Sequence, residues 1–325
     1  MQTIKNYVGI DISKLCFDAA FEVSGSYRHY KFSNDLSGFK ALAMELPVDS
    51  HVVMEASGPY YLQLACYFHE LGLGVSVVNP LVIRRFCQMR LSRAKTDKKD
   101  ALMIAEYGKA EHPSLWQPEE AYVLELRQLQ ALSDQLNKHR TSLIRQQEAF
   151  DQLPVKSKQV LRSIRRSLTF IEKELVELEV KMQELIKQYH GKMYEQIQTI
   201  PGLGKKTALL LIVLSGGFTK FAGCRQLCSY VGLSPRIFES GSSVKGRSKI
   251  TKMGMSRIRA MLYLCAWSAK KCNQTCKELY DRLVAKGKSK RLALIAVANK
   301  LLKQAFAIAT QDTIYEPHHQ KNICL

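Results

Sequence analysis

The chain has 325 residues, which is too long for one small core, so we expect two domains and a connecting segment. Its 48 Lys and Arg against 29 Asp and Glu give a net charge of +19. A surface that positive repels itself unless a polyanion screens it, which favours DNA or RNA as the partner. An anionic membrane surface is the alternative, but the longest apolar run, residues 208–214, is far shorter than a bilayer span.

The nine cysteines are scattered and odd in number, which indicates reduced thiols and a cytoplasmic location. Cys224 and Cys228, like Cys272 and Cys276, are four residues apart. Zinc sites usually use tighter pairs with histidines at set spacings, so thiols in the core or on the surface are favoured over a zinc site. Residues 1–10 lack a basic start followed by a long apolar stretch, so we expect no secretory signal.

The first part of the chain alternates between strand and helix signals. Strands are predicted at residues 7–10, 15–21, 27–32, 51–54 and 74–78, and helices at residues 36–46, from the turn at Ser57 to a stop at Gly72, from Leu81 and from Asp97. Three consecutive strands followed by alternating helices and strands predict an α/β domain with a mixed sheet, over residues 1–115.

Pro113 and Pro118 mark the next boundary. The long helix expected at residues 119–150 has a heptad spacing at Leu129, Leu132, Leu136, His139, Leu143, Gln146 and Phe150. After a turn at Pro154, a second helix repeats this spacing at Ile171, Leu175, Leu178, Met182 and Leu185. The pattern predicts an antiparallel coiled-coil hairpin over residues 116–192. It could be a spacer, a brace for nucleic acid or a dimerisation element, and we favour dimerisation.

The remaining chain is basic and mainly α-helical, with a domain predicted at residues 193–312, a last helix at residues 291–309 and a disordered polar tail at residues 313–325. Near its start, Gly202, Gly204, Lys205 and Lys206 form a glycine-containing turn before a helix. Such a turn resembles a helix-hairpin-helix, whose free N–H groups bind DNA phosphates. A plain corner between two helices is the alternative.

Four acids form the main candidate site. Asp11 and Glu55 each directly follow an apolar strand, and such positions lie at the edge of a sheet where α/β domains build sites. Asp97 and Asp100 are three residues apart and therefore share a helix face. Converging carboxylates are tolerated when Mg²⁺ or Mn²⁺ neutralises them, and two such ions can promote phosphodiester cleavage. Each acid also has a simpler interpretation, a turn cap for Asp11, solvated charges for Glu55 and Asp100, and a helix N-cap for Asp97.

Cations accompany these acids and a downstream serine-rich loop. Candidate nucleic-acid contacts near the acids are Arg84, Arg85, Arg90, Arg93 and Lys95. The loop at residues 238–247 contains Ser240, Ser242 and Ser243, with Lys245, Arg247, Lys249 and Lys252 as candidate phosphate contacts. A serine of this loop could act as a nucleophile if neighbouring positive charge stabilises its alkoxide, but a loop that grips a phosphate or is simply mobile is the favoured interpretation from these residues alone.

Several blocks resemble a known family. Gly9-Ile10-Asp11, Glu55-Ala56-Ser57-Gly58 and residues 95–101 look like the three blocks of the DEDD transposase domain. Ile200-Pro201-Gly202-Leu203-Gly204, Leu233-Ser234-Pro235 and residues 239–243 look like the C-terminal domain of the same family. These are the blocks of IS110-type insertion-sequence transposases, which are related to Piv-type DNA invertases, and they occur in the family's order and spacing.

The resemblance implies an RNase H-like, RuvC-like N-terminal domain in which Asp11, Glu55, Asp97 and Asp100 bind Mg²⁺ or Mn²⁺. It implies that Ser240 becomes covalently linked to a DNA strand end, at an active site to which different subunits contribute the serine and the acids. It further implies donor and target DNA as partners, a guide (bridge) RNA encoded by the element, dimers that pair into tetramers, and a bacterial or archaeal cytoplasm.

Three functions therefore compete. The first is a site-specific recombinase that cuts and rejoins DNA, the second is a metal-dependent junction nuclease that does not rejoin, and the third is a non-catalytic scaffold for nucleic acid. We favour the recombinase, and Ser240 distinguishes it from the nuclease.

Overall fold

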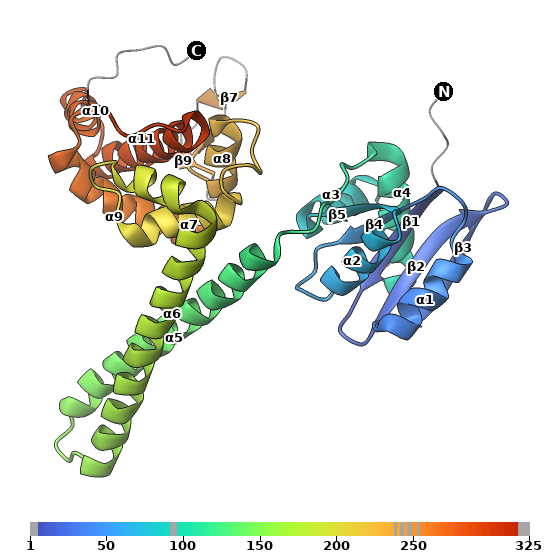
Figure 1. The fold of residues 1–325 in the computed structure, drawn as a ribbon, viewed down its shortest axis with the longest axis horizontal. Helices are drawn as coiled ribbons and strands as arrows, with labels where there is room; N and C mark the ends of the chain where they lie inside the picture. The colour runs from blue at the N-terminus through green and yellow to red at the C-terminus, as the bar shows by residue number, and fades with distance from the viewer. Residues whose placement is uncertain are drawn as a thin grey trace. The chain divides into compact units, whose positions relative to one another are not determined.

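The computed structural model describes residues 6–91, 96–236, 239–240, 244–245, 249–251 and 254–317. The chain divides into two compact units, Met1–Glu119 and Glu120–Leu325. The first is an α/β unit and the second is mainly helical, as Figure 1 shows.

The first unit contains a five-stranded mixed sheet, as predicted. Its elements are β1 (Asn6–Ile12), β2 (Cys16–Val23), β3 (Ser26–Ser33), α1 (Leu36–Glu45), β4 (Ser50–Glu55), α2 (Leu62–Glu70), β5 (Gly74–Val78), α3 (Pro80–Met89) and α4 (Asp97–Glu111). The strand order is β3-β2-β1-β4-β5, with β1–β2 and β2–β3 antiparallel and β1–β4 and β4–β5 parallel. One detail differs from the prediction: β1 continues to Ile12, so Asp11 lies inside the strand, because it pairs with Asp18 of β2.

The two faces of this sheet have different roles. Alternation along β1 places Val8 and Ile10 in the larger of the two hydrophobic cores of this unit, with Phe39 of α1 and Leu64 of α2. The intervening residues of β1, among them Gly9 and Asp11, face the opposite side, where α4 packs. The other side has a smaller core in which Val53 of β4 packs with Ile104 of α4, and the polar side chains lie at the start of α4.

Gly9 sets how closely α4 approaches β1. A Cβ atom at Gly9 would lie 2.1 Å from the carbonyl oxygen of Ala101 and 2.2 Å from the backbone nitrogen of Ala105. These are backbone atoms of α4, so any side chain at this position would push the helix away from the strand. The glycine is thus a positional requirement for bringing the N-terminus of α4 next to Asp11.

Replacing Gly9 with alanine should therefore damage both stability and activity. We expect a loss of about 2 kcal/mol in the free energy of unfolding, because overpacking against backbone is not relieved by a rotamer change. Urea denaturation of the full chain measures this loss. Gly191→Ala is the matched control, because a Cβ there meets nothing within 4 Å. Equal stabilities of the two variants would contradict the close approach.

The second unit begins with two long helices, α5 (Ala121–Asp151) and α6 (Lys158–Gln198), which lie side by side as a hairpin (Figure 1). The inner positions of α6 follow the predicted spacing, since Ile171, Leu178, Met182 and Leu185 are buried. Helical geometry breaks once within α6, at His190.

The predicted inner face of α5 is wrong at alternate positions. Leu132 is 47% exposed, whereas its neighbour Ser133 is buried. Similarly, His139 and Gln146 are exposed and the residues after them are half-buried. The reason is that Leu126 belongs to the core of the C-terminal helices, and counting in steps of three and four from Leu126 leads to Leu129, Ser133 and Leu136. Packing of Leu126 near the start of α5 thus sets which face of the helix points toward α6.

The rest of the second unit is a helical body with short strands. It contains α7 (Lys205–Ser215), α8 (Cys224–Val231), α9 (Ser256–Cys272), α10 (Gln274–Ala285) and α11 (Lys290–Gln311). The strand pairs are β6 (Pro235–Arg236) with β9 (Lys249–Ile250) and β7 (Glu239–Ser240) with β8 (Val244–Lys245). The eight described cysteines of the chain are free.

Helix α11 is the central element of this body. Among the described helices it alone is long and apolar enough to cross a membrane by length and composition. Its buried side chains, including Leu294, Val297, Leu301 and Leu302, belong to the core of the second unit. In this fold α11 is therefore a core helix.

The tail is more ordered at its start than predicted. The backbone nitrogen of Tyr315 donates to Thr199 Oγ1 at 2.8 Å, and its hydroxyl donates to Asn273 Oδ1 at 3.0 Å. These two bonds hold the chain to the end of α6 and the start of α10. Residues 318–325 lie outside the described part of the chain.

Candidate active site

The four predicted acids come together at one place in the first unit. Asp11 lies on β1, Glu55 ends the adjacent parallel strand β4, and Asp97 and Asp100 lie in the first turn of α4. Burial, followed by the charges of Asp100, Glu55 and Asp97, raises the pKa of Asp11 to about 6. The effect of three other carboxylates on Asp11 shows that these acids form one electrostatic cluster.

Local hydrogen bonds position two parts of this cluster. The Oγ of Ser57 donates to Oε1 of Glu55 at 2.5 Å, which holds that carboxylate beside the turn after β4. Thr96, and not Asp97, is the N-cap of α4, because Thr96 Oγ1 accepts from the backbone nitrogen of Lys99 at 3.3 Å. The interpretation of Asp97 as a cap is therefore wrong, and both acids of α4 lie at the positive end of the helix dipole.

The donor set suits a divalent cation. Carboxylate oxygens are the ligands that Mg²⁺ and Mn²⁺ prefer, and a cation would relieve the repulsion that raises the pKa of Asp11. Within the described residues, no three His, Cys, Asp or Glu side chains are spaced as a ready-made metal cage. The chemistry of the cluster fits a metal, and the carboxylates would have to draw closer together to ligate it.

The raised pKa of Asp11 predicts a pH dependence of the metal-free protein. Since the unfolded chain has an aspartate pKa near 4, the folded state binds the proton more tightly, and stability falls as pH rises from about 4 through 6. We expect the protein in EDTA to be more stable at pH 5 than at pH 7 from this group alone, by about 0.5 kcal/mol after allowing for solvent screening of the partly exposed carboxylate. Thermal denaturation of wild type and Asp11→Asn at both pH values isolates the effect, and an identical pH dependence in the two proteins would refute it.

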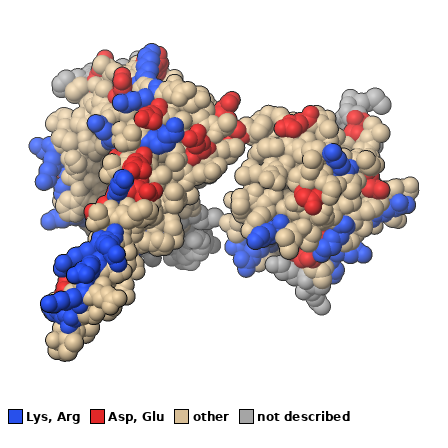
Figure 2. Space-filling model, turned by 60° about the horizontal axis from the view of Figure 1, so that its bottom comes forward, with Lys and Arg blue, Asp and Glu red and all other residues tan. Residues whose placement is uncertain are grey.

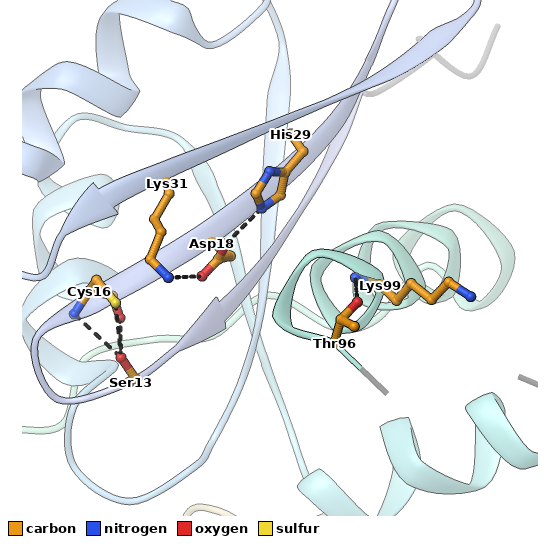
Figure 3. Close-up of polar contacts among 7 residues, drawn as sticks. All are labelled: Ser13, Cys16, Asp18, His29, Lys31, Thr96 and Lys99. Carbon is orange, nitrogen blue, oxygen red and sulfur yellow. Dashed lines mark hydrogen bonds and ion pairs between the residues drawn. The ribbon is translucent and has the colours of Figure 1, made fainter. Parts of the chain in front are cut away.

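The structure adds a group that the sequence motifs did not identify. Asp18 of β2 lies directly opposite Asp11 and is only 5% exposed. Its Oδ1 contacts His29 Nε2 at 2.7 Å, and its Oδ2 contacts Lys31 Nζ at 3.7 Å (Figure 3). The signal that could have found it is the two-residue turn at Ser24 and Gly25, because both have positive φ and such a turn sets the register of β2 and β3.

The predicted nucleic-acid contacts fall in several places. Arg84, Arg85 and Arg90 are exposed on or next to α3, with the guanidinium of Arg90 over the Phe86 ring at 5.3 Å. Arg93 and Lys95 lie outside the described residues. These three described cations belong to the same unit as the acids, which is compatible with a role in holding DNA near them.

The glycine-containing turn lies between α6 and α7. Gly202 has φ +93° and fits against Ala269 of α9, where a Cβ would come within 2.6 Å of the Ala269 backbone. Gly204 is the N-cap of α7 and offers no side-chain capping bond. Lys205 and Lys206 are exposed, and Lys206 Nζ contacts Glu179 Oε2 at 2.8 Å. Gly202 thus has a packing role whether or not this turn binds DNA.

The serine-rich loop is described only through its strand backbones. Ser240 lies on β7 and pairs with Val244 of β8, and the side chain of Ser240 lies outside the described part. The same holds for the side chains of Lys245 and Lys249, whereas Arg247 and Lys252 lie wholly outside it. The chemistry of Ser240 therefore rests on sequence.

Further cations that no motif singled out gather on the hairpin. Figure 2 shows Lys and Arg side chains along one side of the projecting hairpin. The exposed ones around its turn are Arg145, Lys156, Lys158, Arg162, Arg165 and Arg166. With Glu148 and Asp151 as the acids of this stretch, the turn end of the hairpin is strongly positive, as expected of a surface that meets phosphates.

Comparison with known proteins agrees with this arrangement. A DEDD transposase profile, described as a transposase, matches residues 8–153, and a profile described as transposase of the IS116/IS110/IS902 family matches residues 194–281. The chain is 32% identical to a pilin gene-inverting protein of Moraxella lacunata, over 96% of this chain and 98% of that protein. It is 24% identical to the transposase for insertion sequence element IS1111A of Coxiella burnetii, over 81% of this chain and 79% of that protein. The acids in the first matched region and the helical body in the second therefore identify the chain as a member of the IS116/IS110/IS902 family of transposases, enzymes that cut and rejoin DNA.

Proposed function

We propose that this transposase exchanges DNA strands through a covalent link between Ser240 and a strand end, with the acid cluster activating the phosphate under the direction of a guide RNA. The observation that carries the proposal is the gathering of Glu55, Asp97 and Asp100 around Asp11. Such a cluster serves little structural purpose, since it destabilises the charged form of its own central residue.

The acids Asp11, Glu55, Asp97 and Asp100 would hold Mg²⁺ or Mn²⁺, which supplies Lewis-acid stabilisation of charge on a phosphate. The chain's own contribution is to orient these carboxylates, through the Ser57 bond to Glu55 and the close fit of α4 on Gly9. The family as a whole implies use of a divalent metal, and the choice of Mg²⁺ is part of the proposal.

In the covalent step, the Oγ of Ser240 bonds to phosphorus, one P–O ester bond of the DNA backbone breaks, and the departing oxygen takes a proton. Ser240 matches the serine of the family's C-terminal motif. Exchange is completed when a hydroxyl of the second strand attacks the same phosphorus and releases the serine. Each bond broken is thus replaced by one formed, so no external energy source is required.

The proposed nucleic-acid partners and dimer are supported by the net charge and by exposed apolar side chains. A net charge of +19 suits a protein that holds donor DNA, target DNA and a guide RNA, whose base pairing would supply the choice of sequence. Phe170, Val176 and Val180 of α6 are each more than half exposed, which supports the hairpin as a dimerisation element. The proposal also includes dimers that pair into a tetramer and a coiled-coil geometry of the hairpin. It further includes DNA contacts by the turn before α7 and a cytoplasmic location.

The direct test is to trap the covalent link. Full-length protein that is purified with its bound RNA is mixed with labelled DNA of the element junction and Mg²⁺, then run on a denaturing gel. We expect a protein–DNA adduct that disappears with proteinase treatment, and sequencing of the bound RNA should yield segments complementary to both DNAs. Cleavage without any adduct would instead establish the metal-dependent junction nuclease.

A further inference from the structure

Charged side chains lie at one level across four neighbouring strands of the first unit. Asp11 of β1 pairs with Asp18 of β2, and Asp18 in turn pairs with Lys31 of β3. On the other side of β1, Glu55 follows Met54, which is the partner of Ile10. Since residues opposite each other in a sheet point to the same face, Lys31, Asp18, Asp11 and Glu55 form a row beneath the start of α4.

Asp18 is the buried member of this row. Its side chain is 7% exposed, and two side chains of β3, which pairs with β2 on the side away from Asp11, contact its carboxylate. His29 Nε2 holds Oδ1 at 2.7 Å, while Lys31 Nζ lies 3.7 Å from Oδ2 (Figure 3). The shorter contact belongs to His29, so Lys31 is the looser of the two partners.

Lys31 combines exposure with closeness to the acids. Its side chain is 56% exposed, and its pKa is raised chiefly by the negative charge of Asp18 and further by that of Asp97. The ammonium therefore stays protonated near one of the four acids of the cluster. A single contact at 3.7 Å leaves N–H donors of the ammonium available for another anion.

We propose that Lys31 binds the DNA phosphate on which the acid cluster acts, and that Asp18 is its positioning residue. This inference rests on the proposed function of the acids. A phosphate beside the metal-binding carboxylates carries its own negative charge. A lysine at the end of the row is placed to neutralise the additional charge that develops on this phosphate during cleavage. His29 already holds Oδ1 of Asp18 at 2.7 Å, so keeping this carboxylate in position does not require Lys31.

The test measures the single-turnover cleavage rate of labelled element-junction DNA by the full-length protein with its bound RNA and Mg²⁺. We expect Lys31→Gln to slow cleavage about 10- to 100-fold, while Lys31→Arg keeps the rate within about fivefold. The matched control is Arg28→Gln, because Arg28 lies on the same strand and faces the opposite side of the sheet. That control should cleave at the wild-type rate.

A second readout separates phosphate binding from damage to the acids. Mn²⁺ affinity of the DNA-free protein should be unchanged within about threefold in Lys31→Gln, because the lysine acts on the phosphate and not on the metal. Asp18→Asn should slow cleavage through Lys31, so the double variant Asp18→Asn with Lys31→Gln should be no slower than Lys31→Gln alone within about twofold. Independent, multiplying losses would show that Asp18 does not act through Lys31.

The outcomes distinguish this inference from the proposed function. If wild type cleaves, Asp11→Asn does not, and Lys31→Gln cleaves at the full rate, the inference fails and the function stands. If Lys31→Gln and Lys31→Arg both weaken Mn²⁺ binding tenfold, Lys31 has a structural role and the inference also fails. If wild type cuts no DNA, or cuts it as fast after Asp11→Asn, the proposed function fails and takes the inference with it.

Discussion

Replacing Asp11 with asparagine should stop DNA strand exchange and, at the same time, make the metal-free protein more stable. Asn keeps the shape of the side chain but removes the charge that would hold a cation, so we expect the rate to fall about 1,000-fold or more. The charge it removes is disfavoured by burial and by Asp100, Glu55 and Asp97, so the free energy of unfolding in EDTA at pH 7.5 should rise by about 1 kcal/mol.

The measurement pairs a recombination assay on element-junction DNA with thermal denaturation of the same preparations. A gain in stability rules out misfolding as the cause of lost activity, which a loss of activity alone would not. Glu45→Gln is a suitable control, because Glu45 ends α1, the helix that packs on the opposite face of the sheet. Full activity of Asp11→Asn, or wild-type activity in excess EDTA, would remove the metal mechanism.

The second large effect is expected at Ser240. Ser240→Ala should abolish both the covalent adduct and strand exchange, a loss of about 1,000-fold or more, because no other group supplies the bond to the strand end. The neighbouring substitutions Ser242→Ala and Ser243→Ala are the matched controls, because each removes one hydroxyl group from the same loop. Both controls should retain the adduct and exchange within about tenfold.

The pattern of residual activity in Ser240→Ala is informative. If the acids alone direct water to the phosphate, the variant should still nick DNA without rejoining it, and the protein would be a junction nuclease in its first step. If Ser242→Ala loses the adduct and Ser240→Ala keeps it, the nucleophile has been assigned to the wrong serine. Recombination at the full rate by Ser240→Ala would end the serine mechanism.

The acids could be found from sequence because each has a local signature. Asp11 and Glu55 come at the ends of short apolar runs, and Asp97 and Asp100 share a helix face. Their convergence also needed the sheet order, since β1 and β4 become neighbours only after the chain has passed through β2, β3 and α1. The alternation of strands and helices predicted a mixed sheet but not the order of its strands.

Asp18 and Lys31 were missed because their relation to Asp11 depends on register. A shift of one residue between β2 and β3 would move Lys31 to the other face of the sheet. The turn at Ser24 and Gly25 contains the needed information, and counting outward from it pairs Asp18 with Lys31. A polar residue inside an otherwise apolar strand was the available clue, because Asp18 interrupts Phe17 and Ala19.

The hairpin shows the limit of periodicity. A leucine every three or four residues predicted that Leu132 faces inward, and the spacing is equally satisfied by a face that includes Ser133. Contact between Leu126 and the helical body decides between the two faces. That contact joins residues far apart in the chain, so no local pattern contains it.

The placement of Leu126 has a consequence for biosynthesis. The core cluster that contains it also contains Leu301 and Leu302 of α11, the last described helix of the chain. The sheet of the first unit and α4 precede this core in the chain and can fold while translation continues, whereas the core of the second unit is complete only after α11 has been made. A chain truncated before α11 should therefore assemble the acid cluster but lack the complete core of the second unit.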